Sequence, residues 1–166
     1  MTIKKVALIT GSSGFIGFHL AKFLLSYDWK IIGLDAMTDY YDVNLKNARQ
    51  KLLCKNLNFY NYKGLVQDTE LLNEIYSLHK PNIVIHLAAQ AGVRYSIENP
   101  ISYVESNLIG TFHILEMARK YKPDHLLMAS TSSVYGSNKD MPLHETQKCD
   151  TPMSFYAATK KSNEAM

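Results

Sequence analysis

Cysteine is scarce in this sequence, and its scarcity excludes two kinds of site. The 166 residues include only Cys54 and Cys149, far apart in the chain and outside any spacing typical of metal ligands. Two such cysteines cannot build the disulfide framework of a small secreted domain. These cysteines favour a reducing, cytoplasmic location. Because the six histidines are also scattered, we expect no metal site.

Long apolar runs and a strong net charge are missing as well. No run approaches the roughly 20 apolar residues that cross a membrane. The short run "VALIT" (6–10) follows a basic start and leads into glycines, which predicts a strand rather than a signal peptide. The formal net charge is only +3 and the 18 Lys and Arg residues are scattered. We therefore expect no binding to nucleic acid or membranes.

Short apolar segments alternate with amphipathic ones along the whole chain. The strand-length segments, expected to be buried on both faces, are 6–10, 30–34, 57–62, 82–88 and 125–130. The expected buried faces of two helices are marked by Ile16, Leu20, Phe23 and Leu24, and by Val104, Leu108, Phe112 and Leu115. This series predicts an α/β fold over residues 1–166, with a Rossmann-type, doubly wound parallel sheet.

A glycine-rich loop, "TGSSGFIG", joins the first strand to the first helix. Gly11 permits a tight turn, Gly14 lets backbone N–H groups approach a pyrophosphate, and Gly17 lets the helix pack close to the sheet. Asp35 ends the second strand, 18 residues after Gly17. A carboxylate there accepts hydrogen bonds from the ribose hydroxyls of NAD and repels the 2′-phosphate of NADP. The sequence therefore predicts a dinucleotide site that prefers NAD.

Near the C-terminus, Tyr156 and Lys160 stand one helical turn apart, and Thr131 lies 25 residues before Tyr156. With motifs such as "HLAAQAGVRYSIENP" (86–100), "ASTSSVYG" (129–136) and "YAATKKSNE" (156–164), the chain resembles the extended short-chain dehydrogenase/reductases. Within them it resembles the NAD-dependent epimerase/dehydratase family, most closely the UDP-glucuronate 4-epimerases. The likeness covers the N-terminal half of those enzymes.

The resemblance implies a catalytic role for three residues. Tyr156 would be the general base, and the positive charge of Lys160 would lower the pKa of its phenol. Thr131 would hydrogen-bond the sugar. A transient oxidation at C4 to a 4-keto sugar, followed by hydride return to the other face, would then epimerise a UDP-sugar such as UDP-glucuronate or UDP-galacturonate.

The resemblance also implies the residues that bind cofactor and substrate. The expected NAD contacts are Gly11, Gly14, Phe15, Ile16, Gly17, Asp35, Asp68, Leu87, Ala88, Ala89, Tyr156 and Lys160. The expected substrate contacts are Arg94, Thr131, Ser132 and Ser133. Simpler interpretations stay open: Arg94 in a surface ion pair, the two serines capping a loop, and Asp68 capping a helix.

Two positions separate this chain from relatives. Ser133 stands where related decarboxylases and 4,6-dehydratases carry an acidic residue, which favours epimerisation. Leu65 stands where relatives usually carry the Asp that binds the adenine amino group. We expect Asn107 to be structural and His86 to be a packed or backbone-bonded histidine.

The chain ends inside the helix that carries Lys160, before the substrate domain of its relatives. We therefore expect the NAD-binding half of a longer, homodimeric enzyme. The alternatives are a catalytically silent NAD-binding fragment and a nucleotide-sugar 4,6-dehydratase or decarboxylase of the same superfamily.

Overall fold

Five parallel strands form one sheet in the computed structural model, which describes residues 5–166. The strands are β1 (Val6–Thr10), β2 (Lys30–Asp35), β3 (Phe59–Lys63), β4 (Ile83–His86) and β5 (His125–Met128). Their order across the sheet is β3-β2-β1-β4-β5. The chain thus moves outward in one direction from β1 and then in the other, which confirms the predicted doubly wound sheet.

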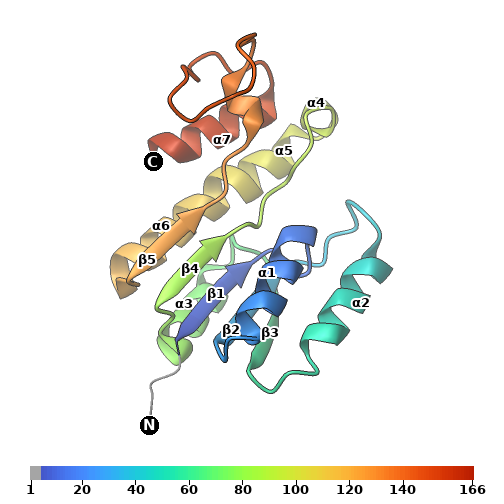
Figure 1. Cartoon of the computed structure of the whole chain (residues 1–166), viewed down its shortest axis with the longest axis vertical. Helices are drawn as coiled ribbons and strands as arrows, with labels where there is room; N and C mark the ends of the chain where they lie inside the picture. The colour runs from blue at the N-terminus through green and yellow to red at the C-terminus, as the bar shows by residue number, and fades with distance from the viewer. Residues whose placement is uncertain (1–4) are drawn as a thin grey trace.

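Helices cover both faces of the sheet (Figure 1). They are α1 (Phe15–Leu25), α2 (Val43–Leu53), α3 (Thr69–His79), α4 (Tyr95–Glu98), α5 (Pro100–Tyr103), the π-helix η1 (Val104–Ile109), α6 (Gly110–Tyr121), the 3-10 helix η2 (Ser132–Tyr135) and α7 (Phe155–Ala165). The C-terminal ends of β1, β4 and β5 point to the same side of the molecule, and α7 lies beyond the end of β5 (Figure 1).

The core has two layers because alternate residues of each strand face opposite sides of the sheet. On one side, Ala7 and Ile9 of β1 pack with α1 and α2; on the other, Leu8 packs with α3 and α6. The helices begin where the sequence supplies caps. Asp42, Asp68 and Ser154 accept hydrogen bonds from first-turn N–H groups of α2, α3 and α7.

The predicted buried faces of two helices were only partly right. Helix α1 buries Gly17, Phe18, Ala21 and Leu25. Of the predicted residues, Leu20 and Leu24 pack partly buried against this core, whereas Ile16 and Phe23 are exposed. The continuous α5–η1–α6 segment buries Tyr103, Asn107, Thr111 and Ile114, whereas Phe112 is exposed. Polar side chains occupy the second buried face because they find hydrogen-bond partners there, so an apolar stripe does not mark it.

The edge strands also differ from the expectation of burial on both faces. Residues of β3 and β5 are largely exposed, while β1, β2 and β4 are buried nearly throughout. The prediction about a signal peptide rests partly on residues 1–4, which lie outside the described residues. Over residues 5–166, no helix is both long and apolar enough to cross a membrane.

Gly17→Ala should destabilise the fold, because the added Cβ would overlap the carbonyl oxygen of Gly11. We expect a loss of about 1–3 kcal/mol in the free energy of unfolding, as for other overpacked sites. Gly14→Ala is the matched control, since its Cβ would lie 3.1 Å from the same oxygen and needs only a small shift. Urea unfolding of both variants measures the difference, and equal stabilities would contradict this packing argument.

Candidate functional site

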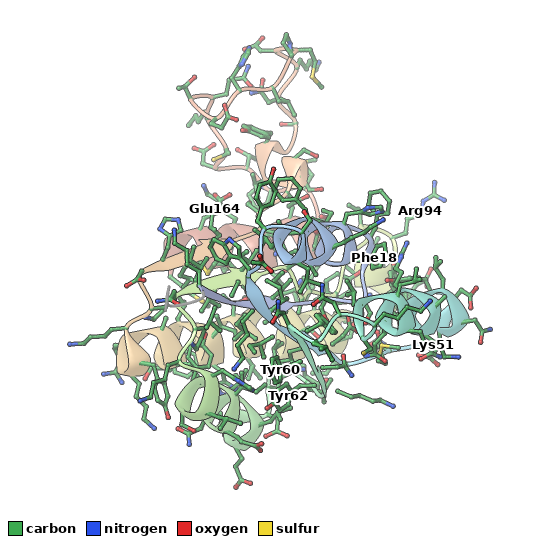
Figure 2. All side chains as sticks on the ribbon, turned by 60° about the horizontal axis from the view of Figure 1, so that its bottom comes forward. Phe18, Lys51, Tyr60, Tyr62, Arg94 and Glu164 are labelled. Atoms are coloured by element: carbon green, nitrogen blue, oxygen red, sulfur yellow. The ribbon has the colours of Figure 1, made fainter. Side chains whose placement is uncertain are left out.

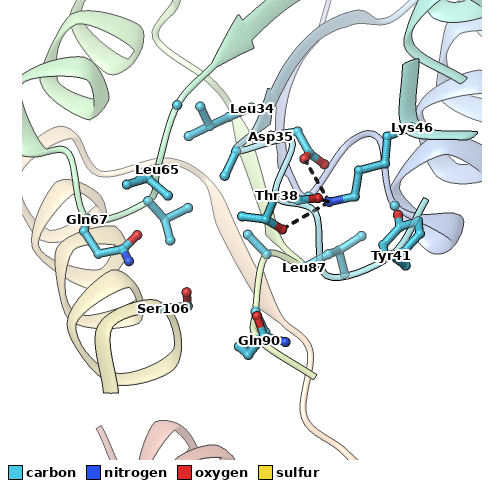
Figure 3. Close-up of a pocket in the computed structure, with 17 residues that line it drawn as sticks. Leu34, Asp35, Thr38, Tyr41, Lys46, Leu65, Gln67, Leu87, Gln90 and Ser106 are labelled. Atoms are coloured by element: carbon cyan, nitrogen blue, oxygen red, sulfur yellow. Dashed lines mark hydrogen bonds and ion pairs between the residues drawn. The ribbon is translucent and has the colours of Figure 1, made fainter. Parts of the chain in front are cut away.

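A pocket opens at the C-terminal ends of β1, β2 and β4, where doubly wound sheets bind their ligands (Figure 3). It is lined by the glycine loop, the end of β2, the segments after β3 and β4, and η1. The lining side chains that Figure 3 labels are Leu34, Asp35, Thr38, Tyr41, Lys46, Leu65, Gln67, Leu87, Gln90 and Ser106.

The glycine loop forms one wall of this pocket. Gly11 has φ +72°, a left-handed conformation that favours glycine, and a Cβ there would lie 3.0 Å from the backbone nitrogen of Ala88. Gly14 is the N-cap of α1, and no side chain of the described residues caps this end of the helix. The helix N-terminus therefore offers N–H donors and a partial positive charge to an anion.

Asp35 is held rigidly at the edge of the pocket. Its Oδ2 accepts the backbone N–H of Ser13 and its Oδ1 accepts the backbone N–H of Met37, both at 2.9 Å. The residue is only 6% exposed. Each carboxylate oxygen keeps a further lone pair for a ligand. Gly11, Gly14 and Asp35 thus meet in one pocket, together with Leu87, Ala88 and Ala89, whereas Gly17 is buried against Gly11 and is not part of the lining.

A buried hydrogen-bond chain fixes the floor of the pocket. The Thr10 hydroxyl accepts the N–H groups of Leu87 (3.1 Å) and Ala88 (3.0 Å), so its own proton is donated to Nδ1 of His86 at 2.8 Å. His86 then carries its proton on Nε2, which donates to Thr111 at 3.1 Å. The expected packed histidine is therefore bonded to side chains, and burial lowers its pKa from 6.5 to about 3.

Helix α7 presents the predicted tyrosine and lysine. Lys160 is 5% exposed, its Nζ donates to the carbonyl of Ala129 at 2.6 Å, and burial lowers its pKa. Tyr156 is half-buried, and its ring meets that of Tyr103 edge-on with centroids 5.9 Å apart. The packing of α7 against η2 brings this helix to the segment that begins at Thr131.

Thr131, Ser132 and Ser133, the hydroxyl residues predicted to contact the substrate, form a small capped turn. Thr131 is the N-cap of η2, and its Oγ1 accepts the backbone N–H of Ser133 at 3.3 Å. Its hydroxyl lies 3.3 Å from that of Ser133. Ser132 is exposed.

Asn107, which the sequence analysis expected to be structural, joins the two parts of the site. Its amide accepts the N–H of Gln90 at 2.8 Å, donates to the carbonyl of Gln90 at 3.0 Å, and donates to Thr159 at 3.1 Å. Its own carbonyl accepts from Asn163 at 2.8 Å. The loop after β4 is thereby tied to the helix that carries Tyr156. The signal available in the sequence was an asparagine within an amphipathic helical segment.

Other predicted residues lie outside the pocket lining. Asp68 caps α3 and accepts from Leu71 N–H at 3.0 Å. The side chains of Phe15 and Ile16 are exposed, so only their backbone N–H groups face the ligand end of α1. Arg94 is exposed, and its side chain projects from the body of the molecule (Figure 2).

Two pocket residues bear on ligand choice. Leu65, 48% exposed, presents an apolar side chain to the pocket (Figure 3). Lys46, which the sequence analysis did not consider, reaches the pocket from α2. It lies seven residues before the buried Leu53, on the same face of the helix, and this spacing was the signal available in the sequence.

Comparison with known proteins identifies the relatives of this chain. The family model for GDP-mannose 4,6 dehydratase matches residues 8–166. A probable UDP-glucuronate 4-epimerase of Rhizobium meliloti is 49% identical over 159 residues, which are 96% of this chain and 47% of that protein. The UDP-glucuronate 4-epimerase of Thermodesulfobacterium geofontis is 44% identical over 159 residues, 96% of this chain and 49% of that protein.

Solved structures agree with these sequence relatives. UDP-glucuronic acid 4-epimerase from Bacillus cereus, in complex with UDP-glucuronic acid and NAD, superposes with a TM-score of 0.88 at 33% identity, covering 96% of this chain and 50% of that one. The dTDP-glucose 4,6-dehydratase of Bacillus anthracis, in complex with NAD, superposes with a TM-score of 0.81 at 31% identity, covering 97% of this chain and 48% of that one. The chain spans about half the length of the relatives it matches.

The buried His86 should make stability depend on pH. Because its pKa is about 3 in the folded protein and 6.5 ordinarily, the unfolded chain takes up the proton first as pH falls. The free energy of unfolding should therefore fall below pH 6.5, by up to about 1.4 kcal/mol per pH unit. Urea unfolding from pH 7.5 to 4.5, compared with His86→Gln, isolates this contribution. Parallel curves for the two proteins would show that His86 does not cause it.

Proposed function

Because the chain belongs to the NAD-dependent epimerase/dehydratase family, the family of the GDP-mannose 4,6 dehydratase model, we propose that residues 1–166 are the NAD-binding domain of a nucleotide-sugar 4-epimerase. The observation that carries the proposal is that the pocket and the helix of Tyr156 and Lys160 are joined to each other. The open helix N-terminus and Asp35 lie in one pocket, and Asn107 ties the loop beside that pocket to the helix of Tyr156 and Lys160.

The chemistry of the pocket fits NAD. Because Gly11 has no side chain, the glycine loop packs closely against the backbone of Ala88, and a pyrophosphate at the uncapped end of α1 could accept from the N–H groups of the first turn. Asp35 keeps lone pairs for ribose hydroxyls, and Leu65 and Val66 offer an apolar wall to the adenine. When bound, NAD would supply the acceptor and later the donor of a hydride at C4 of the sugar.

In this proposal, Tyr156 takes the proton from the C4 hydroxyl of the sugar and returns it after the sugar has turned over. Lys160 is well placed for a second role, because it is buried and its ammonium group donates to the carbonyl of Ala129, the residue that follows β5. It would hold the nicotinamide ribose and keep a positive charge near the phenol. Thr131, rigid as an N-cap, would hydrogen-bond the reacting oxygen.

We propose a UDP-uronic acid, UDP-glucuronate or UDP-galacturonate, as the substrate. The relatives from Rhizobium meliloti and Bacillus cereus support it by name. The Bacillus anthracis dehydratase shares the fold, so the fold alone does not select the reaction. Ser133 does, because a hydroxyl cannot act as the strong acid or base that dehydration needs. Ser132 and Ser133 would face the sugar carboxylate.

We also propose that the complete enzyme is a homodimer. Ile101, Ile109 and Phe112 on the α5–α6 segment are 59%, 41% and 51% exposed. Such apolar side chains on one continuous helical segment support an interface with a second copy.

NADP should bind at least tenfold more weakly than NAD, because its 2′-phosphate would approach the Asp35 carboxylate in a partly desolvated pocket. A tenfold difference corresponds to about 1.4 kcal/mol. Calorimetric titration of this chain with both cofactors measures the ratio. Equal affinities would rule out Asp35 as the residue that selects the cofactor.

Tyr156→Phe and Lys160→Met should separate catalysis from binding. Tyr156→Phe removes the proton acceptor and should slow epimerisation by at least ~10²-fold while NAD affinity survives. Lys160→Met should lower both the rate and the NAD affinity. Affinity is measured on this chain, and turnover of UDP-glucuronate on a chimera that joins it to the C-terminal half of the Rhizobium meliloti relative.

A role in packing gives the opposite pattern. Both variants would then melt at lower temperature but turn over at a near-normal rate per folded molecule. A Tyr156→Phe chimera within threefold of the unsubstituted chimera would end the catalytic assignment.

A further inference from the structure

We propose that Lys46 is a second ribose-binding residue, which pairs with Asp35 to recognise the vicinal diol of the adenosine ribose. This inference rests on the proposed binding of NAD. In this inference, the choice between NAD and NADP depends on a donor, Lys46, and an acceptor, Asp35, and not on the carboxylate alone.

Lys46 is unusual because it is a lysine buried at the edge of a pocket. Its side chain is 7% exposed and comes from α2 into the space beside Asp35 and Thr38 (Figure 3). Lysine is rarely buried without a partner, since removing its charge from water is costly. Tyr41 covers it, with the ammonium 4.6 Å from the ring centroid. The structure thus holds a cation where the ribose of a dinucleotide would lie.

The ammonium group of Lys46 has one N–H donor that is not used in a hydrogen bond within the described residues 5–166. Its Nζ donates to the carbonyl of Thr38 at 2.9 Å and lies 3.3 Å from the Thr38 hydroxyl. Asp35 Oδ1 is 4.0 Å away, which is an ion pair but too long for a hydrogen bond. An ammonium has three N–H groups, so one has no acceptor at hydrogen-bond distance among residues 5–166.

The pair therefore offers complementary groups to a diol. Asp35 can accept a proton from one ribose hydroxyl, and Lys46 can donate to the oxygen of the other. A 2′-phosphate has two negative charges and cannot donate to Asp35, although Lys46 would attract it. Lys46 should thus strengthen NAD binding and also soften the rejection of NADP that Asp35 imposes.

A chemical double-mutant cycle tests the contact. The probes are ADP, 2′-deoxy-ADP and 3′-deoxy-ADP, titrated into the unsubstituted chain and into Lys46→Met. In the unsubstituted chain, loss of either hydroxyl should weaken binding at least fivefold. In Lys46→Met one of these two penalties should fall below twofold while the other, due to Asp35, remains. Penalties unchanged by the substitution, or absent from the unsubstituted chain, would overturn the inference.

Lys46 also holds the segment at Thr38, and Thr38→Val is the control for that role. This variant loses the hydroxyl that Lys46 contacts but keeps the lysine and the carbonyl. We expect it to retain both deoxy penalties. Loss of the same penalty as in Lys46→Met would mean that the loop, not the ammonium, causes the effect. Thermal melting of each variant confirms that it is folded before titration.

The cofactor choice gives a second, independent readout. In Asp35→Asn, the remaining Lys46 should bring NADP affinity to within threefold of NAD affinity, and adding Lys46→Met should remove that gain. An Asp35→Asn protein whose NADP affinity stays the same when Lys46→Met is added would contradict the inference. If the unsubstituted chain bound neither NAD nor ADP, the proposed function itself would fail.

Discussion

The hydrogen bonds of the Thr10 hydroxyl fix the crevice between the carboxyl ends of β1 and β4, and the rest of the site depends on this crevice. Strands β1 and β4 are neighbours, yet the chain leaves them in opposite directions across the sheet, so their carboxyl ends must separate. Thr10 uses both lone pairs for the N–H groups of Leu87 and Ala88 and its proton for His86. The Ala88 N–H finds its partner in this way, and the Leu87 N–H is shared between the hydroxyl and the backbone carbonyl of Thr10. The crevice is therefore open and rigid at once.

The second constraint is the distance along the chain between the two halves of the site. The proposed cofactor pocket is lined by residues between 11 and 106, whereas Tyr156 and Lys160 come from the last helix. Asn107 spans them, because its one side-chain amide bonds both the backbone N–H and the backbone carbonyl of Gln90 and also reaches Thr159 of α7. It lies in a π-helix, a form that is rare and often found at functional sites. The wider turn of the π-helix therefore occurs at the residue that ties the two halves of the site together.

Hydrophobic periodicity located the five strands but overestimated the burial of β3 and β5, and it misplaced the most buried helix faces, for a reason visible in the η1–α6 segment. The most apolar stripe, which includes Phe112, is not the buried one. Asn107 and Thr111 are each at most 2% exposed, and each is hydrogen-bonded to the sheet side of the site. A periodicity analysis counts such residues as surface, since it has no knowledge of their partners.

The sequence by itself determined the parallel sheet, the glycine loop, Asp35 and the tyrosine–lysine pair. These depend on local order: short apolar segments form strands, glycines permit a turn, and residues four apart share a helix face. Only the tertiary structure decided that Lys46 is buried beside Asp35, that Asn107 ties two segments together, and that Asp68 caps a helix outside the pocket lining. Such roles depend on which distant groups meet, and a side chain's partners are fixed only when the strands and helices have packed.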